Sequence, residues 1–158
     1  MMRRVISAGI VGSGFSANFH IDALKKVYGV QVEIIGVYSP NNSDKFAQNH
    51  KIKSYKSLHE LINDADIIHC CAIASMHQSI AISALEADKS VIVEKPFTGY
   101  FGDGSASFNG STFPKQEGLE KAMESVMLMM DAEKKSKGRI YYAENWVYAP
   151  SVQKEIEI

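Results

Sequence analysis

A glycine-rich turn near the start of the chain limits its possible folds more than any other feature. Residues 5–11 are apolar and β-branched, as in a buried strand, and Gly12-Ser13-Gly14-Phe15-Ser16-Ala17 follows directly. This hexapeptide matches the pattern G-x-G-x-x-G/A, with alanine in the third place. The pattern is informative only where a strand leads into the turn and a helix leaves it, and this sequence fits that context. It predicts a dinucleotide pyrophosphate site at Gly12, Ser13, Gly14, Phe15 and Ser16.

Each small residue of this turn has a physical reason to be there. Gly12 permits the tight turn, Gly14 lets the backbone approach a pyrophosphate, and Ala17 lets the helix lie close to the sheet. The N–H groups at the start of the helix then face the phosphates together with the positive end of the helix dipole. A glycine-rich turn that binds no ligand is the alternative interpretation.

The rest of the chain alternates apolar strands with helical segments, which predicts an α/β doubly wound parallel sheet with right-handed crossovers. The strands read as continuous apolar runs, as strands covered on both faces do. We expect strands at 5–11, 32–38, 66–73, 90–93 and 139–144. We expect helices at 19–27, 43–50, 58–63, 79–87 and 116–137.

Three local features of this pattern carry expectations of their own. Ser43 and Ser57 are candidate caps for the helices that they begin. Met123, Met127 and Met130 share one face of the last long helix, and such a stripe is most often part of a core. Residues 98–115 form an insertion rich in glycine, serine and aromatic residues. This segment either packs against a substrate or another surface, or closes on itself.

Size and charge narrow the class of protein. The 158 residues suit one domain with a sizeable core, and 17 basic residues nearly balance 18 acidic ones. This balance disfavours a nucleic-acid binder and a polybasic membrane patch. No window reaches the roughly 18 apolar residues of a membrane helix. Cys70 and Cys71 should point to opposite faces of a strand as unpaired core thiols, which fits a cytoplasmic protein.

The end of the second expected strand bears on the choice of cofactor. A carboxylate at this tip would bind the adenosine ribose diol of NAD, but the sequence continues as Ser39-Pro40-Asn41-Asn42-Ser43-Asp44-Lys45. Ser39 and Asn41 can hold either a diol or a 2′-phosphate, and Lys45 would help with the phosphate. NAD and NADP both stay open, with a lean to NADP.

A second chemical motif, Glu94-Lys95-Pro96, ends the fourth expected strand. The carboxyl ends of parallel strands face the ligand crevice of a doubly wound sheet. There Lys95 suits proton or hydrogen-bond chemistry on a substrate hydroxyl or carbonyl, and Glu94 can bond a ribose or orient the lysine. A solvated Glu–Lys surface pair is the alternative. We assign no residue as a metal ligand.

The order and spacing of Gly12-x-Gly14, His20, His77 and Glu94-Lys95-Pro96 resemble the glucose–fructose oxidoreductase/inositol dehydrogenase (Gfo/Idh/MocA) family. Members join an N-terminal Rossmann domain to a C-terminal α/β domain that closes the active site and builds the oligomer. They move hydride between nicotinamide and the carbinol carbon of sugars, inositols and similar polyols. The resemblance implies that Lys95 is the active-site lysine and that Glu94 contacts the cofactor.

The same resemblance implies further cofactor contacts and a domain boundary. Ala72, Ile73 and His77 would lie along the nicotinamide, and Asn145 and Trp146 would approach nicotinamide and substrate. Residues 1–150 would form the NAD(P)-binding domain, and residues 151–158 would begin a linker helix to a C-terminal substrate domain that is absent here. The full-length protein would form a homo-oligomer and act on a small sugar or polyol.

The sequence departs from the family in two places. The usual Thr-Pro-Asn before His77 is replaced by Ala72, Ile73 and Ala74, which leaves only backbone contacts there. The Asp-x-x-x-His segment of the second domain has no counterpart, so this piece should bind NAD(P) with little turnover. A non-catalytic NAD(P)-sensing or scaffold module is the alternative function. A methyltransferase using S-adenosylmethionine is weaker, because it leaves Glu94-Lys95-Pro96 without a role.

Overall fold

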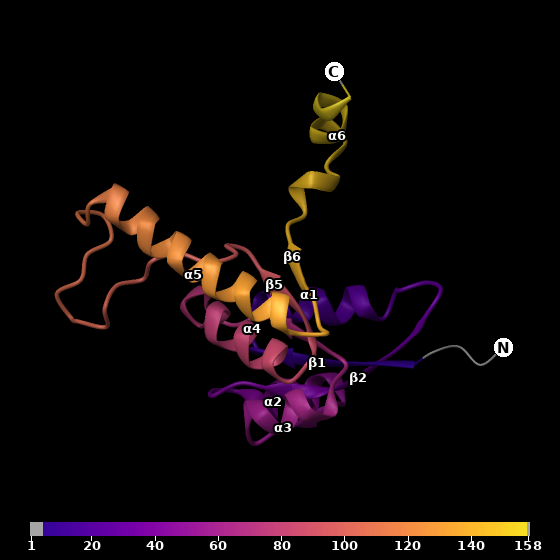
Figure 1. Cartoon of the computed structure of the whole chain (residues 1–158). Coiled ribbons are helices and arrows are strands. Elements are labelled where there is room, and N and C mark those ends of the chain that lie inside the picture. Colours follow the sequence, from indigo (N-terminus) through magenta and orange to yellow (C-terminus); the bar gives the residue numbers. More distant parts are fainter. Residues whose placement is uncertain (1–4, 158) are drawn as a thin grey trace.

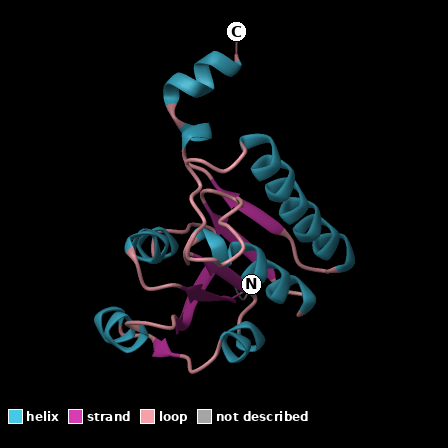
Figure 2. Ribbon diagram, turned by 90° about the vertical axis from the view of Figure 1, so that its left-hand side faces the viewer, coloured by secondary structure: helices cyan, strands magenta, loops and turns pink. Residues whose placement is uncertain are grey.

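Six parallel strands form one sheet in the computed structural model, which describes residues 5–157 (Figures 1 and 2). The spatial order is β3-β2-β1-β4-β5-β6, so the chain runs outward from β1 to β3 and returns to β4. This is the doubly wound Rossmann arrangement expected from the sequence. The strands are β1 (Val5–Val11), β2 (Gln31–Tyr38), β3 (Lys53–Ser54), β4 (Ile67–Cys70), β5 (Ser90–Glu94) and β6 (Ile140–Ala143).

Helices cover both faces of this sheet and enclose two separate cores (Figure 2). Helices α1 (Phe15–Leu24) and α2 (Ser43–His50) bury Ile21 and Phe46 on one face. The other face buries side chains of α3 (Leu58–Asp64), α4 (His77–Glu86) and α5 (Lys115–Lys135). The elements outside these layers are η1 (Ala74–Met76), η2 (Trp146–Tyr148) and α6 (Pro150–Ile156).

The register of the strands brings their carboxyl ends to one edge of the sheet. Val11 pairs with Tyr38 on one side and with Cys70 on the other. Glu94, the last residue of β5, pairs with Ala143, the last residue of β6. The loops that follow these strands therefore share one edge, where ligands of doubly wound sheets bind.

Helix α1 differs from its predicted position. It begins at Phe15 and ends at Leu24, whereas the apolar spacing predicted residues 19–27. Phe19 and Val27 are exposed, and the buried residues are Ala17 and Ile21. The helix begins directly after the glycine turn, and the residue of its first turn that packs in the core is the small Ala17.

Of the two predicted helix caps, the structure confirms one and not the other. Ser57 caps α3 as predicted, since its hydroxyl accepts a hydrogen bond from the Glu60 N–H. The prediction for Ser43 was wrong, because Ser43 is the first residue of α2 and its hydroxyl donates to the Val37 carbonyl. Asn42 stands at the cap in the left-handed region. The two-residue strand β3 had no counterpart in the sequence pattern.

The methionine stripe of α5 is not part of the core. Met123, Met127 and Met130 are 50 %, 52 % and 37 % exposed, so the expectation of core packing was wrong for these three residues. The helix buries Ser125 and Met129 instead, and α5 lies alongside α4 (Figure 1). A second face of this helix, shifted from the stripe, therefore provides its attachment to the domain.

Residues 98–114 form a loop that closes on its own aromatic rings. Tyr100, Phe108 and Phe113 pack against one another with ring centroids 4.9 to 5.5 Å apart. Of the two expectations for this segment, the structure favours the loop that closes on itself. At the other end, α6 extends away from the sheet (Figures 1 and 2). No helix within residues 5–157 is long and apolar enough to cross a membrane.

Cys70 and Cys71 lie in opposite cores, as their adjacent positions predicted. Cys70 belongs to the core beneath α3, α4 and α5, and Cys71 belongs to the core beneath α1 and α2. Both are free thiols, and burial raises the pKa of Cys70 to about 12 and that of Cys71 further. A thiol with so high a pKa is a core side chain and not a nucleophile at neutral pH.

Candidate functional site

The turn between β1 and α1 is held against the loop after β4. Gly12 has a φ of +105°, and a β-carbon placed there would lie 2.5 Å from the carbonyl oxygen of Cys71. The Gly12 N–H donates to the Tyr38 carbonyl at 2.8 Å, and the Cys71 N–H donates to the Val11 carbonyl. Only glycine fits this position. The two hydrogen bonds bring the tips of β1, β2 and β4 together around the turn.

Gly14 stands in a different environment two residues later. It is exposed, and nothing lies within 4 Å of a β-carbon built there. It is the N-cap of α1, and among residues 5–157 no side chain accepts a hydrogen bond from the N–H groups of the first turn. Those N–H groups remain available to an anion, which is the arrangement that a pyrophosphate needs. Residues of the turn, including Phe15 and Ser16, thus fit the phosphate part of a dinucleotide.

Ser13 links this turn to the loop after β2. Its hydroxyl lies 3.1 Å from the Ser39 hydroxyl and donates to the Asn41 carbonyl at 2.9 Å. Three residues that the sequence suggested for cofactor binding are therefore in direct contact. The side chain of Asn41 is exposed, so its backbone carbonyl provides the link.

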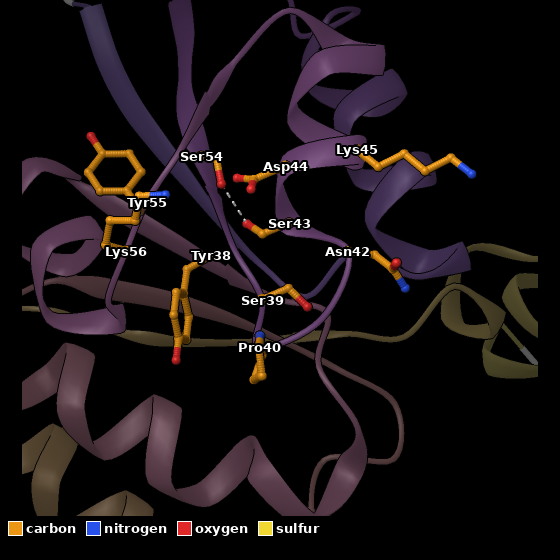
Figure 3. A pocket seen from close by; sticks show the side chains of 10 residues that line it. All are labelled: Tyr38, Ser39, Pro40, Asn42, Ser43, Asp44, Lys45, Ser54, Tyr55 and Lys56. Atoms are coloured by element: carbon orange, nitrogen blue, oxygen red, sulfur yellow. Dashed lines mark hydrogen bonds between the residues drawn. The ribbon is translucent and has the colours of Figure 1, made fainter.

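A hollow of about 410 Å³ opens beside this loop, between the ends of β2 and β3 (Figure 3). Inside it the Ser54 hydroxyl donates to the Ser43 hydroxyl at 3.1 Å. Burial and a hydrogen bond to Asp64 raise the pKa of the nearby Tyr55 phenol to about 12, so the phenol stays neutral. The hollow is lined by Tyr38, Ser39, Pro40, Asn42, Ser43, Asp44, Lys45, Ser54, Tyr55 and Lys56.

Sequence reasoning identified only one side of this hollow. It considered the segment from Ser39 to Lys45, but it missed Ser54, Tyr55 and Lys56, which lie at the end of β3 and directly after it. A strand of two residues leaves no periodic signal in the sequence. The pairing of Gly36 with Lys53 and of Val37 with Ser54 places these residues beside the end of β2.

The Glu94-Lys95-Pro96 motif lies at the tip of β5, on the same sheet edge. Glu94 is largely buried and bonded through both carboxylate oxygens, to a His20 ring nitrogen at 3.0 Å and to the Lys95 N–H at 3.1 Å. Lys95 is exposed, and within residues 5–157 no carboxylate pairs with its ammonium group. The lysine is therefore free to meet a ligand while the glutamate is fixed.

His69 is a further polar residue of this region that the sequence did not single out. It lies on β4, is 5 % exposed, and its Nδ1 is 2.8 Å from Nδ1 of His20. Burial, with a smaller contribution from His20, lowers the pKa of His69 to about 3. A single histidine inside an apolar run gave no sign of this contact, since its partner lies 49 residues away.

The loop after β4 places Ala72 and Ile73 beside the glycine turn. Ile73 is 72 % exposed, whereas His77 is 1 % exposed at the first residue of α4. The two His77 ring nitrogens lie 2.9 Å from the Pro96 carbonyl and 3.1 Å from the Ala72 carbonyl. The His77 side chain thus braces the two loops, and the contact of this segment with the cofactor stays a prediction.

Asn145 and Trp146 follow β6 at the next position along the edge. The Trp146 N–H donates to a Glu144 carboxylate oxygen at 3.0 Å, and the indole is 68 % exposed. Both residues therefore lie beyond the tip of β6, next to the strand that ends in Glu94. Their contact with nicotinamide stays a prediction.

Comparison with known proteins agrees with this geometry. The family model for the oxidoreductase family with an NAD-binding Rossmann fold, Gfo/Idh/MocA, matches residues 6–108, which is more than half of the chain. This chain belongs to the Gfo/Idh/MocA oxidoreductase family. The matched residues run from β1 into the loop after Glu94-Lys95-Pro96, so they contain both chemical motifs.

Two curated relatives of this Gfo/Idh/MocA chain are sugar or polyol dehydrogenases by name. Inositol 2-dehydrogenase of Salmonella typhimurium is 37 % identical over 98 residues, which are 58 % of this chain and 29 % of that protein. Glucose-6-phosphate 3-dehydrogenase of Bacillus subtilis is 32 % identical over 90 residues, 56 % of this chain and 25 % of that protein. The aligned part is thus less than a third of either relative.

Solved structures share the fold over nearly the whole chain. The WlbA dehydrogenase of Bordetella pertussis, in complex with NADH and UDP-GlcNAcA, has a TM-score of 0.76 at 20 % identity, covering 98 % of this chain and 42 % of that one. Biliverdin reductase of Synechocystis, in complex with biliverdin and NADP⁺, has a TM-score of 0.71 at 18 % identity, covering 96 % and 42 %. At such identities the likeness establishes the Rossmann fold.

Proposed function

We propose that this chain is the cofactor-binding part of an NAD(P)-dependent dehydrogenase that acts on a CH–OH group of a sugar or polyol. The observation that carries the proposal is the meeting of two motifs at one sheet edge: the glycine turn with its uncapped helix N-terminus, and the exposed Lys95. The names of the relatives, which mention inositol and glucose 6-phosphate, support a polyhydroxylated substrate.

Each group of residues at this sheet edge has a role that follows from its position. The N–H groups at the start of α1 hold the pyrophosphate, and Gly14 leaves room for it. The bound nicotinamide supplies the site for hydride transfer. Lys95 reaches the substrate oxygen and holds or moves its proton, since no carboxylate in the described part of the chain pairs with its ammonium group.

We propose NADP as the preferred cofactor, because of the chemistry of the hollow beside Ser39. Its lining has two lysines, Lys45 and Lys56, against one acid, Asp44, and no carboxylate stands at the tip of β2. The Ser39 hydroxyl accepts from Ser13, so its own proton is left as a donor for a 2′-phosphate. In Figure 3 the Lys45 side chain extends away from Ser39, so its ammonium group must rotate inward to reach the phosphate.

A comparison of two cofactors tests this preference. Wild-type chain should bind NADPH more tightly than NADH, and Lys45→Ala should weaken NADPH binding by about tenfold, the value of one charge-assisted hydrogen bond. Binding of NADH should not change. Lys135→Ala on the distant helix α5 is the matched control for loss of a lysine. Equal affinities for the two cofactors, unaffected by Lys45→Ala, would contradict the NADP assignment.

Hydride transfer itself is tested with the full-length natural protein. Incubation with polyols and sugars plus NADP⁺ should produce reduced nicotinamide, and Lys95→Met should lower kcat by about 10²-fold or more while leaving cofactor affinity within a small factor. Cofactor binding without turnover on any such substrate would instead favour a sensing or scaffold module.

The setting of the protein is part of the same proposal. Buried free thiols suit a reducing compartment, so we place the protein in the cytoplasm. By resemblance to the family, we expect the full-length protein to assemble into a homo-oligomer. Sedimentation of that protein against this chain would test the assembly, because a monomer in both cases contradicts it.

A further inference from the structure

Three polar side chains from three different elements form a largely buried chain of hydrogen bonds across the sheet face under α1. His20 lies on α1, His69 on β4 and Glu94 at the tip of β5. The two Nδ1 atoms of the histidines are 2.8 Å apart, and Nε2 of His20 is 3.0 Å from Oε1 of Glu94. The second oxygen of Glu94 accepts the Lys95 N–H. This series of hydrogen bonds thus begins at His69 in the core and ends at the backbone of Lys95.

The proton positions in this chain follow from its partners. A carboxylate accepts only, so His20 donates to Glu94 from Nε2. The short distance between the two Nδ1 atoms requires one proton between them, carried by His69 when His20 is neutral. Because burial keeps the pKa of His69 low, at about 3, His69 stays uncharged under ordinary conditions. The chain is then a carboxylate, an imidazole and a second imidazole joined by two hydrogen bonds.

Two simpler interpretations fit the geometry less well. A metal site would hold its ligands around a common centre, but the described residues 5–157 contain no group of three suitable ligands in such an arrangement. A solvated surface pair would be exposed, whereas the His20 and Glu94 side chains are 12 % and 19 % exposed and His69 is 5 % exposed. The distances and burial are those of a satisfied internal network.

The network joins the two motifs that meet at the sheet edge. Helix α1 begins at the glycine turn, and Glu94 precedes Lys95. We propose that His20 is a positioning residue: supported by His69, it holds the Glu94 carboxylate in place, and so fixes the Lys95 backbone relative to the helix that binds the pyrophosphate. This inference rests on the proposed function, because it concerns the same cofactor edge.

The physical consequence of losing His20 is specific. The Glu94 carboxylate would lose the partner of Oε1 and could turn toward the ammonium group of the adjacent Lys95, with which no carboxylate of residues 5–157 is paired. A lysine captured in this way is no longer free for a ligand. The network therefore keeps two adjacent, oppositely charged side chains apart, which their sequence positions alone would not do.

The network can be tested in the ligand-free chain, independently of any cofactor. In ¹⁵N-labelled protein, Nε2 of His20 should be protonated, and a scalar coupling should pass between the Nδ1 atoms of His20 and His69 through their shared proton. Glu94→Gln should shift the His20 ring resonances, whereas His59→Gln, on the exposed face of α3, should not. Absence of the coupling, with an unprotonated Nε2 on His20, would overturn the network.

The positioning role is tested by cofactor affinity. His20→Phe keeps a ring but removes the donor that holds Glu94, the residue expected to contact the cofactor, so it should weaken NADPH binding about tenfold. His20→Gln, which restores an N–H donor, should recover part of the loss, and His59→Phe should have no effect. Where circular dichroism shows His20→Phe to be unfolded, Glu94→Gln replaces it and should likewise weaken binding.

The outcomes separate this inference from the proposed function. If wild-type chain binds neither cofactor although the coupling between the histidines is present, the proposed function fails and the network stands. If wild-type chain binds NADPH and a folded His20→Phe binds it equally well, the positioning role is wrong and the proposed function stands.

Discussion

Gly12 and Gly14 lie two residues apart in one motif, and the structure gives them opposite tolerances. A side chain at position 12 would strike the backbone of Cys71 and would need a positive φ. A β-carbon at position 14 would have no atom of the described residues 5–157, apart from its chain neighbours, within 4 Å. Gly12 is therefore required by the fold, whereas Gly14 is required only by a ligand that comes close to the turn.

This difference gives a paired prediction. Gly12→Val should lower the free energy of unfolding by roughly 3 kcal/mol or more, because both backbone strain and a clash are introduced. Gly14→Val should change it by only about 1 kcal/mol yet abolish cofactor binding. Urea unfolding and a cofactor titration of each variant provide the two readouts. Unchanged affinity in Gly14→Val would show that the pyrophosphate lies elsewhere.

The buried His69 predicts a pH dependence of stability. Its pKa is lowered from 6.5 to about 3 in the folded chain, mainly by burial with a smaller contribution from His20, so the unfolded chain binds the extra proton first. The stabilisation is complete above about pH 6.5 and is lost as the pH falls toward 3, by up to about 1.4 kcal/mol per pH unit. Glu94, through His20, is the acidic group at the other end of the network.

Urea unfolding at several pH values between about 7 and 5 measures this slope. His69→Gln should show a shallower fall in stability than wild type, and His59→Gln, which alters an exposed histidine, should match the wild-type slope. Identical slopes in all three proteins would mean that His69 is protonated in the folded state. In that case the buried network would have a different proton arrangement.

The sequence identified some residues of the candidate site and missed others for a clear reason. The glycine turn and Glu94-Lys95-Pro96 are contiguous, and each follows a strand, so their place at the sheet edge could be predicted. His69 and Lys56 acquire their positions from strand pairing and from partners far along the chain. Such residues have no local pattern. The burial of His77, which the resemblance places along the nicotinamide, could not be predicted from its motif position either.

At the scale of elements, apolar periodicity predicted most helices but assigned the wrong face in two. In α1 the spacing of large apolar residues favoured Phe19, which is 60 % exposed, while the close approach to the sheet selects small Ala17. In α5 the methionine stripe is exposed and Met129 is buried against the sheet side. When a helix has apolar residues on more than one face, its sequence alone does not show which face packs against the core.

Helix α5 offers a matched test of its buried face. Met129→Ala should lower the free energy of unfolding by about 2 to 5 kcal/mol, because it leaves a cavity among α4, α5 and the sheet. Met127→Ala removes the same atoms from an exposed position and should cost about 0.5 kcal/mol or less. Thermal or urea unfolding of both variants decides the point. Similar losses in the two would place the methionine stripe in a core after all.

At the scale of the whole molecule, the strand order β3-β2-β1-β4-β5-β6 explains how separate sequence motifs become one site. The chain reverses direction across the sheet between β1 and β4, and ligands of such sheets bind at this switch point. The alternation of strands and helices was enough to predict this arrangement. The 98 aligned residues cover 29 % of the inositol dehydrogenase that the chain matches, so the substrate and its binding are proposals.

The central claim is that the sheet edge around the glycine turn binds NAD(P). Calorimetric titration of this chain with NADPH and with NADH tests it most directly, with Gly14→Val as the folded control. We expect saturable one-to-one binding of NADPH, weaker binding of NADH and no heat of binding in the variant. Binding of neither cofactor to the folded wild-type chain, or equal binding to Gly14→Val, would contradict the account.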